Sequence, residues 1–249
     1  MSFFKSLTKY ERTYYICALI LTVTFAILFP EEDVNGHNGK IIMALMIAYT
    51  VLNVTCELQI AKQDKNNFIV SLFIEFSEIA IMFLLGARFA TMATVVFFWI
   101  PVDIISYVNW RRYPDRYKKE ITQVRGLSGR QEVLVILGIL AWTLVFGTIV
   151  CYVTEHIFVT DLFGGNRNLE VIVCYLDALV SALDIANGTF ILMRFKEQWF
   201  AWYLEVIVDA VIWILSGQYV MLALTVCYLV NTTYGYVKWN NYTKIKNKV

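Results

Sequence analysis

The sequence contains eight apolar stretches that are long enough, or nearly so, to cross the hydrocarbon core of a membrane as helices. A helical span takes about 20 predominantly apolar residues. Of the 249 residues, 59% are hydrophobic and 16% are charged, whereas soluble domains have about 45–50% and about 25%. We therefore predict an all-α polytopic membrane protein with helices at 14–29, 40–61, 68–85, 89–110, 132–153, 169–193, 199–215 and 219–238.

The basic residues orient these predicted helices. Lys and Arg gather in five segments, at 1–12, 62–65, 111–130, 194–196 and 238–248. The segments PEEDVNGHNG and TEHIFVTDLFGGNRN are acidic or neutral apart from Arg167. Loops rich in Lys and Arg remain on the cytoplasmic side of a membrane. Eight passes place every basic segment on that side, so we expect both termini to be cytoplasmic.

The chain also contains a weak internal repeat, in which residues 53–110 resemble residues 184–239. The matched pairs are Asn53 with Asp184, Phe68 with Trp199, Glu78 with Asp209, Gly86 with Gly217, Tyr107 with Tyr236 and Trp110 with Trp239. Both copies enter the membrane from the same side, so the repeats are parallel. Repeats of this kind place a site between them near the midplane.

This repeat predicts the organisation of a single membrane domain. Its parts are an extra N-terminal helix at 14–29, a three-helix repeat at 40–110, a basic cytoplasmic loop at 111–131, a linker helix at 132–153 and a second three-helix repeat at 169–239. The short links GAR and SGQ between successive helices predict tight antiparallel hairpins.

Acidic residues interrupt the apolar stretches. They are Glu75, Glu78, Asp103, Asp177, Asp184, Glu205 and Asp209. Each charged acid near the centre of a span costs about 2.5–3.5 kcal/mol. Because no Lys or Arg lies in the same predicted helices, these acids are expected to face protein, water or a ligand, or to be protonated.

Helical spacing places these polar residues on single faces. At 100° per residue, Trp199, Trp202, Glu205, Asp209 and Trp213 fall within an arc of about 120°. Three further stripes are Asp177, Ser181, Asp184 and Gly188; Ser71, Glu75 and Glu78; and Trp99, Asp103, Tyr107 and Trp110. Indole rings stack on flat and cationic rings, and carboxylates accept hydrogen bonds. Together they suit a flat heterocycle that carries a sugar or a positive charge.

Structural explanations compete with binding at several of these positions. Trp110 and Trp239 lie near helix ends, where tryptophan commonly occupies the membrane–water interface. Asp177 and Glu75 are expected to form hydrogen bonds between helices.

The sequence lacks the patterns of several other protein classes. The net charge of +1 provides no basic field for nucleic acid. The cysteines form no CxxC and the two histidines have no partner at ligand spacing, so neither a metal nor a cofactor is expected. No phosphate-binding loop and no paired nucleophile and base are present, which predicts a protein that is not an enzyme.

Four segments resemble motifs of the PnuC-type vitamin transporter family. They are MRFKEQWFAWYLEVIVDAVIW, NTTYGYVKW, WIPVDIISYVNW and YLDALVSALDIA, and the resemblance spans residues 40–240. It implies a three-plus-one-plus-three helical fold, related in plan to SWEET transporters, in a homotrimer of a bacterial plasma membrane. It also implies facilitated diffusion of nicotinamide riboside, or in subgroups of thiamine, riboflavin or a deoxyribonucleoside. A cytoplasmic kinase then traps the substrate by phosphorylation.

The resemblance also implies substrate contacts. Trp199, Trp202 and Asn231 match family residues expected near the substrate. Asp103 and Gly188 stand where nicotinamide riboside transporters usually have Gln. The complete set of candidate substrate-binding residues is Trp199, Trp202, Asp103, Asp184, Gly188, Glu205, Asp209, Asn231, Glu78 and Asn53. Nicotinamide riboside ranks first as the substrate and a deoxyribonucleoside follows, while a proton-coupled carrier and a non-transporting receptor stay open.

Overall fold

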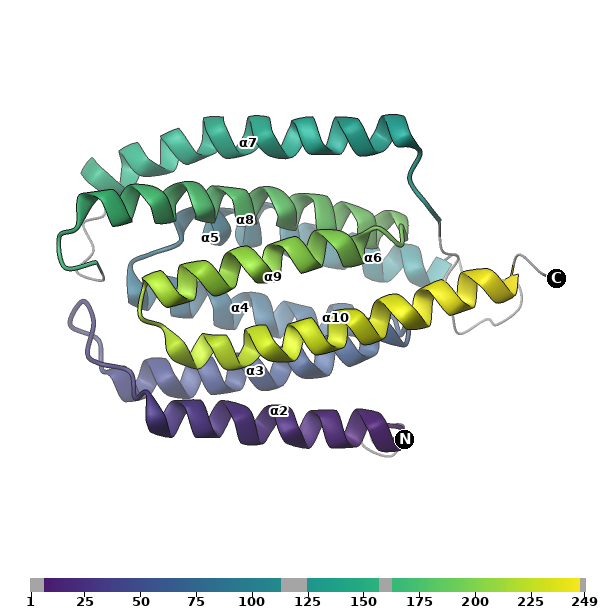
Figure 1. Ribbon diagram of the computed structural model, residues 1–249, viewed down its shortest axis with the longest axis horizontal. Coiled ribbons are helices and arrows are strands. Elements are labelled where there is room, and N and C mark those ends of the chain that lie inside the picture. Colours follow the sequence, from purple (N-terminus) through teal and green to yellow (C-terminus); the bar gives the residue numbers. More distant parts are fainter. Residues whose placement is uncertain (1–6, 113–124, 157–162, 247–249) are drawn as a thin grey trace.

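The computed structural model describes residues 7–112, 125–156 and 163–246, and its named elements are helices that run side by side in one bundle (Figure 1). They are α2 (Lys9–Leu28), α3 (Gly39–Ala61), α4 (Asn67–Leu85), α5 (Phe89–Thr94), η1 (Val95–Trp99), α6 (Ile100–Arg112), α7 (Gly129–His156), α8 (Arg167–Met193), α9 (Gln198–Leu215) and α10 (Tyr219–Lys246). The start of α2 and the end of α10 lie at the same end of the bundle (Figure 1).

Seven helical segments in the described part are long and apolar enough to cross a membrane, counting α5, η1 and α6 as one segment. Another helix, α8, has 27 residues but carries Asp177 and Asp184 within its apolar stretch. All of the predicted stretches are helical, and their ends agree to within three residues except at the start of α2 and the end of α10. Residues 113–124 of the predicted basic loop lie outside the described residues.

The segment from Phe89 to Arg112 contains one wider helical turn, η1, which ends two residues before Pro101. In a regular α-helix the proline ring would clash with the carbonyl four residues earlier, and proline has no N–H to donate. A turn of π-helix accommodates both features, and such turns are frequent at functional sites. It sets the position of Trp99 at the centre of the bundle.

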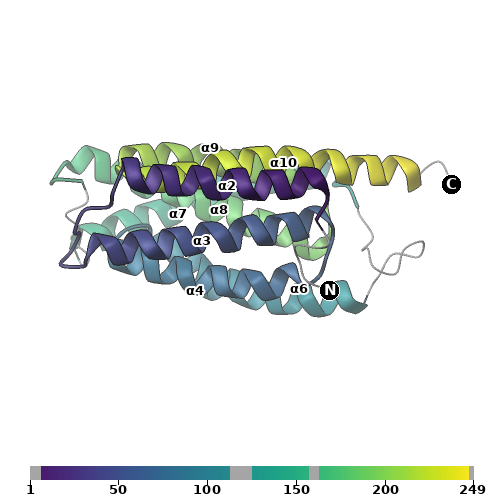
Figure 2. The same cartoon turned by 90° about the horizontal axis from the view of Figure 1, so that it is seen from below.

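Helix α2 is attached to both α3 and α10 (Figure 2). The Glu11 carboxylate is fully buried. It lies 3.0 Å from Lys62 Nζ and 3.5 Å from Lys238 Nζ, and it accepts a hydrogen bond from Tyr234 at 3.0 Å. It also completes a capping box with Thr8, which explains why α2 begins earlier than predicted. One side chain therefore joins three helices.

Glu11→Gln is expected to reduce folding stability by about 1–3 kcal/mol, because the variant weakens charge-assisted hydrogen bonds to a buried group. The midpoint of thermal unfolding in detergent measures this effect. Glu132→Gln is a matched control, since Glu132 is an exposed acid in the first turn of α7. Equal shifts for the two variants would contradict the anchoring role of Glu11.

The predicted interfacial position of Trp110 and Trp239 is wrong. Trp110 is 2% exposed and Trp239 is fully buried. Their indole N–H groups donate to the carbonyl oxygens of Ile191 at 3.1 Å and Ile60 at 3.3 Å. Each ring therefore caps the last turn of a neighbouring helix, which satisfies carbonyl groups that helix ends leave free. The two tryptophans belong to the packed core rather than to a surface belt.

Candidate functional site

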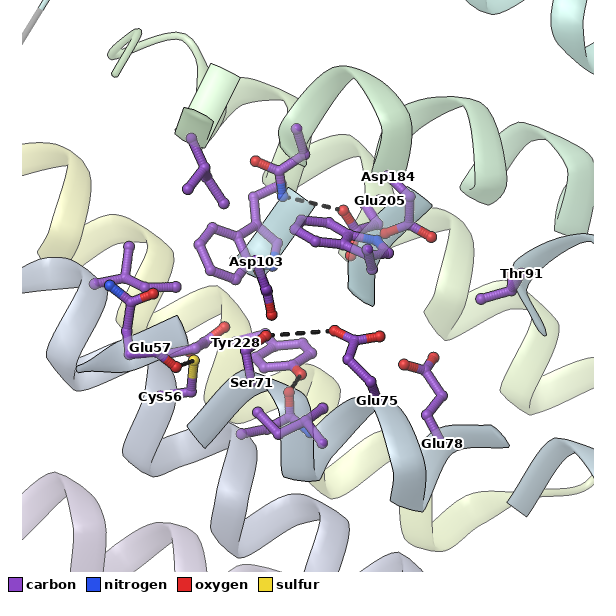
Figure 3. A pocket seen from close by; sticks show the side chains of 18 of the residues that line it. Cys56, Glu57, Ser71, Glu75, Glu78, Thr91, Asp103, Asp184, Glu205 and Tyr228 are labelled. Carbon is purple, nitrogen blue, oxygen red and sulfur yellow. Dashed lines mark hydrogen bonds between the residues drawn. The ribbon is translucent and has the colours of Figure 1, made fainter. Parts of the chain in front are cut away.

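A cavity of about 90 Å³ lies inside the bundle between α3, α4, α6, α8, α9 and α10 (Figure 3). Its lining includes the carboxylates Glu57 from α3, Glu75 and Glu78 from α4, Asp103 from α6, Asp184 from α8, and Glu205 and Asp209 from α9. The polar faces of four predicted helices therefore meet in one space. Ligand pockets for drug-sized molecules typically measure about 300–1,000 Å³, so a nucleoside requires this cavity to widen.

Some of these carboxylates have partners and others do not. Ser71 donates to Glu75 at 3.3 Å and Asn187 donates to Glu205 at 3.4 Å. Both carboxylate oxygens of Glu57, Oε2 of Glu75 and Oδ2 of Asp103 are buried without a hydrogen-bond partner. Figure 3 shows Asp103 pointing toward Ser71 and Glu75. Buried acceptors in this state are costly unless a donor reaches them, so the cavity is suited to a ligand rich in N–H and O–H groups.

The cavity wall also contains a basic residue that the sequence analysis did not identify as part of the site. Arg88, in the link between α4 and α5, is 6% exposed and lines the cavity. Its guanidinium lies 3.3 Å from Asp177 and 2.7 Å from Asp209. No Lys or Arg lies in the same predicted helices as these acids, and the neutralising charge for Asp177 and Asp209 comes instead from the link between α4 and α5.

The conformation of this link explains how Arg88 enters the bundle. Gly86 and Arg88 have φ angles of 63° and 62°, in the left-handed region that glycine adopts at low cost. The chain therefore reverses tightly, as predicted, and the arginine side chain turns back between α8 and α9. The guanidinium also lies over the ring of Trp213, 4.6 Å from its centroid, which adds a cation–π contact. An arginine beside a glycine turn between two acidic helices was the available sequence signal.

Asp177 lies beside the cavity and forms hydrogen bonds that join helices, as predicted from the sequence. Its carboxylate accepts from the Ala90 N–H at 2.9 Å, from Thr91 Oγ1 at 2.5 Å and from Arg88 Nε at 3.3 Å. It thereby satisfies a free N–H group at the start of α5.

The structure places the ten candidate residues in two groups. Seven line the cavity, namely Asn53, Glu78, Asp103, Asp184, Trp202, Glu205 and Asp209. The other three, Trp199, Gly188 and Asn231, do not. Asn231 is 2% exposed and its side-chain amide has no hydrogen-bond partner.

Trp199 and Gly188 lie behind the cavity wall. Trp199 is fully buried and stacks on Trp202, with ring centroids 5.5 Å apart and planes inclined by 18°. Gly235 lets α10 approach the Trp199 ring. At Gly188, an added Cβ would lie 2.6 Å from Phe98, so this glycine allows α8 to pack against η1. Both residues therefore position groups that line the cavity.

Tyrosine and amide side chains complete the wall. Tyr228 from α10 donates to Asn53 on α3, and Tyr49 lies on the same side. The Tyr228 ring lies 6.4 Å from the Trp202 ring. Tyr49, Glu57 and Tyr228 escaped the sequence analysis because α3 and α10 have no single polar stripe. Only packing shows which of their scattered polar residues face the centre.

A second hollow of about 700 Å³ lies at one end of the bundle, between residues 28–36 and the α9–α10 link. Burial raises the pKa of Glu31 in this region from 4.5 to about 7, against the opposing effect of a hydrogen bond with Gln218. The folded protein therefore binds the Glu31 proton more tightly than the unfolded chain does. The stability that Glu31 contributes is fully present below pH 4.5 and is lost as the pH rises through about 7.

Glu31→Gln is expected to match the wild type in acid and to be more stable than it above pH 7, by on the order of 1 kcal/mol after solvent screening. Thermal unfolding in detergent across this pH range measures the difference. Glu32→Gln, at the exposed neighbouring acid, is the control and should follow the wild type. A constant difference between Glu31→Gln and the wild type would contradict burial of Glu31.

Comparison with known proteins agrees with this architecture. A family model described as "Nicotinamide mononucleotide transporter" matches residues 43–241. A "Nicotinamide riboside transporter PnuC" of Neisseria mucosa is 24% identical over 203 residues, covering 78% of this chain and 71% of that protein. The protein of the same name from Haemophilus influenzae is 23% identical over 202 residues, covering 79% of each.

A solved structure shares the fold. The "Crystal structure of the Vitamin B3 transporter PnuC" superposes with a TM-score of 0.69 at 18% identity, covering 96% of this chain and 94% of that chain. The family model, for its part, covers well over half of the sequence. This chain is therefore a member of the nicotinamide mononucleotide transporter family of membrane proteins, as its resemblance to PnuC-type transporters predicts.

Proposed function

We propose that this protein carries a nucleoside-like vitamin across a membrane, with nicotinamide riboside as the first candidate. The observation that carries the proposal is a central cavity, lined by carboxylates and by the indole of Trp202, inside a bundle of apolar helices. Two relatives are named as nicotinamide riboside transporters. No chemical conversion of the substrate is part of this function.

The chemistry of the cavity suits a positively charged ring bound to a sugar. A pyridinium ring is flat and cationic, so it can stack on Trp202 and lie close to carboxylates. Ribose hydroxyl groups are donors for the unpartnered oxygens of Glu75 and Asp103. Trp199 supports this arrangement by holding Trp202 from behind, and Asn231 contributes from α10 if the cavity widens toward it.

We further propose facilitated diffusion as the mechanism. The chain makes eight passes with both termini in the cytoplasm, and the repeats at 40–110 and 169–239 rock against each other around the central site, as in the SWEET plan. The linker helix at 132–153 joins the repeats, while the helix at 14–29 braces them. A cytoplasmic kinase traps the substrate, and the protein works as a homotrimer in a bacterial plasma membrane.

A deoxyribonucleoside is the second candidate substrate, and thiamine, whose thiazolium ring is positively charged, is an alternative of the same family. The observation that favours a deoxyribonucleoside is the surplus of acceptors at Glu57, Glu75 and Asp103. A heterocycle with adjacent N–H donors, such as guanine, satisfies two acceptors at once.

Uptake into liposomes tests the proposal. Purified protein in liposomes should take up labelled nicotinamide riboside in a saturable manner without an ion gradient, and a proton ionophore should leave the rate unchanged. Strict dependence on a proton gradient would replace the passive mechanism with a proton-coupled carrier. Binding without flux would indicate a receptor, and recovery of a modified substrate would indicate an enzyme.

Asp103→Gln is expected to shift preference toward nicotinamide riboside, because it restores the residue usual in PnuC-type nicotinamide riboside transporters. An amide both donates and accepts, so it can bond a carboxamide more fully than a carboxylate can. The ratio of dissociation constants for nicotinamide riboside and deoxyguanosine measures the shift, which we expect to be about tenfold for one hydrogen bond. Glu132→Gln, outside the cavity, is the control. An unchanged ratio would remove Asp103 from substrate selection.

A further inference from the structure

Arg88 forms ion pairs with two acids that differ in exposure and in their other partners. Its partner Asp177 is 2% exposed in its side chain and accepts from Ala90 and Thr91 as well. Its other partner, Asp209, lines the cavity with a side chain that is 17% exposed. Asp177 is therefore a fixed anchor for the guanidinium, whereas Asp209 is held mainly by Arg88 and is open to a competitor.

Arg88 is also the only Lys or Arg among the described residues that line the cavity. It faces the carboxylates of Glu78, Asp184 and Asp209, and Tyr49 lies beside them. A positively charged ligand that enters this space meets acids that already have a cation. At Asp209 it can replace Arg88, because Asp177 continues to satisfy the guanidinium.

We propose that Arg88 is a tethered cation that competes with a cationic substrate for Asp209. This inference rests on the proposed function, since it assumes that the substrate is positively charged. When the substrate ring approaches Asp209, Arg88 is left with Asp177, Thr91 and the Trp213 face. Binding is then an exchange of one cation for another at Asp209, so a positively charged ligand meets competition from Arg88, whereas a neutral ligand of the same shape leaves the Arg88–Asp209 ion pair in place.

The exchange of cations at Asp209 also changes how α9 is held in the bundle. The ion pair between Arg88 and Asp209 joins the α4–α5 link to α9. Ser216 lies seven residues beyond Asp209, about two helical turns further along the same face, and is 8% exposed at the end of α9. Releasing Asp209 removes the ion pair between Arg88 and α9 and leaves the contact with Trp213, which weakens the attachment of this end of α9 to the α4–α5 link. Arg88 therefore couples charge recognition to opening at the end of the bundle that holds the two short links.

Two ligands that differ in charge test the competition. Nicotinamide riboside is cationic, and its dihydropyridine form keeps the ribose and the carboxamide but is neutral. Arg88→Gln should tighten binding of the cation by about tenfold, the size of one charged hydrogen bond, and leave the neutral ligand unchanged. Asp209→Asn should weaken the cation selectively. In the double variant, the effect of Arg88→Gln should disappear.

Arg88→Lys provides a second route if Arg88→Gln does not fold. Lysine keeps a charge for Asp177 but lacks the fork that reaches two acids at once, so it should also favour the cation. Equal effects on both ligands, weaker cation binding in Arg88→Gln, or an Arg88→Gln effect that persists beside Asp209→Asn would each overturn the competition.

A ligand-independent measurement separates this inference from the proposed substrate. Alkylation of Ser216→Cys, located by mass spectrometry, should become several-fold faster when Arg88→Gln or Asp209→Asn is added. An unchanged rate would contradict the proposal that the ion pair between Arg88 and Asp209 holds this end of α9. If neither ligand binds the wild type while alkylation becomes faster, the proposed substrate fails and the role of the ion pair is supported.

Discussion

Asp177→Ala is expected to cost about 3–5 kcal/mol of folding stability, the largest effect of any substitution considered for this chain. The variant removes three accepted hydrogen bonds at once, from Ala90, Thr91 and Arg88. It leaves the Ala90 N–H without its partner and leaves the buried Arg88 with Asp209 as its remaining ion-pair partner. Because a half-paired charge in the bundle is costly, the link between α4 and α5 should detach from α8.

Thermal unfolding in detergent measures this loss. Glu170→Ala is the matched control, because Glu170 lies on the same helix in a more exposed ion pair, 3.7 Å from Arg167. Exposed pairs contribute about 0–1 kcal/mol, so the control should unfold near the wild-type temperature. If the two variants lost similar stability, the hydrogen bonds to Asp177 would not hold the α4–α5 link.

Trp202→Ala is expected to weaken substrate binding by about 1–3 kcal/mol, the range measured for stacking of a base on an aromatic ring, which is about 5- to 150-fold in dissociation constant. Trp202 lines the cavity and is 8% exposed. Trp199 stacks behind it with ring centroids 5.5 Å apart, so the exposed face of Trp202 has a fixed orientation. A ligand ring that stacks on this face loses that contact in the variant.

Binding measured by thermal shift tests this role, since a ligand stabilises the folded protein by mass action. Trp202→Phe should recover part of the affinity because it keeps an aromatic face. Trp142→Ala is the control, because Trp142 lies on α7 outside the central cavity and is 39% exposed. A folded Trp202→Ala protein with wild-type affinity would exclude stacking at this position.

The helices and their polar faces were predictable because they depend on local spacing. Apolar length determined the helical stretches, and a period of 3.6 residues placed Glu75 with Glu78, and Glu205 with Asp209, on single faces. Because a charged acid is costly in lipid, these faces were expected to point into the bundle. Seven of the ten candidate residues do line one cavity, although their role in binding stays a prediction.

The remaining features depend on contacts between distant parts of the chain. Trp110 and Trp239 have the sequence positions of interfacial residues, yet both are buried in the core. Their N–H groups donate to the carbonyl oxygens of Ile191 and Ile60. Trp199 and Trp202 share one stripe, but only Trp202 reaches the cavity, because α10 passes close to Trp199 at Gly235. The spacing of residues along a helix gives the direction of each side chain but does not show which residues that side chain contacts.

The sequence by itself determined that this chain is a bundle of apolar helices whose acidic faces turn inward, because burial in lipid penalises charge wherever it occurs along a helix. Only the tertiary structure decided which cation neutralises those acids. Arg88 lies 89 residues from Asp177 and 121 from Asp209 in the chain, and it enters the bundle from a link. Electrostatic pairing depends on distance in space, and spacing along one helix carries no information about that distance.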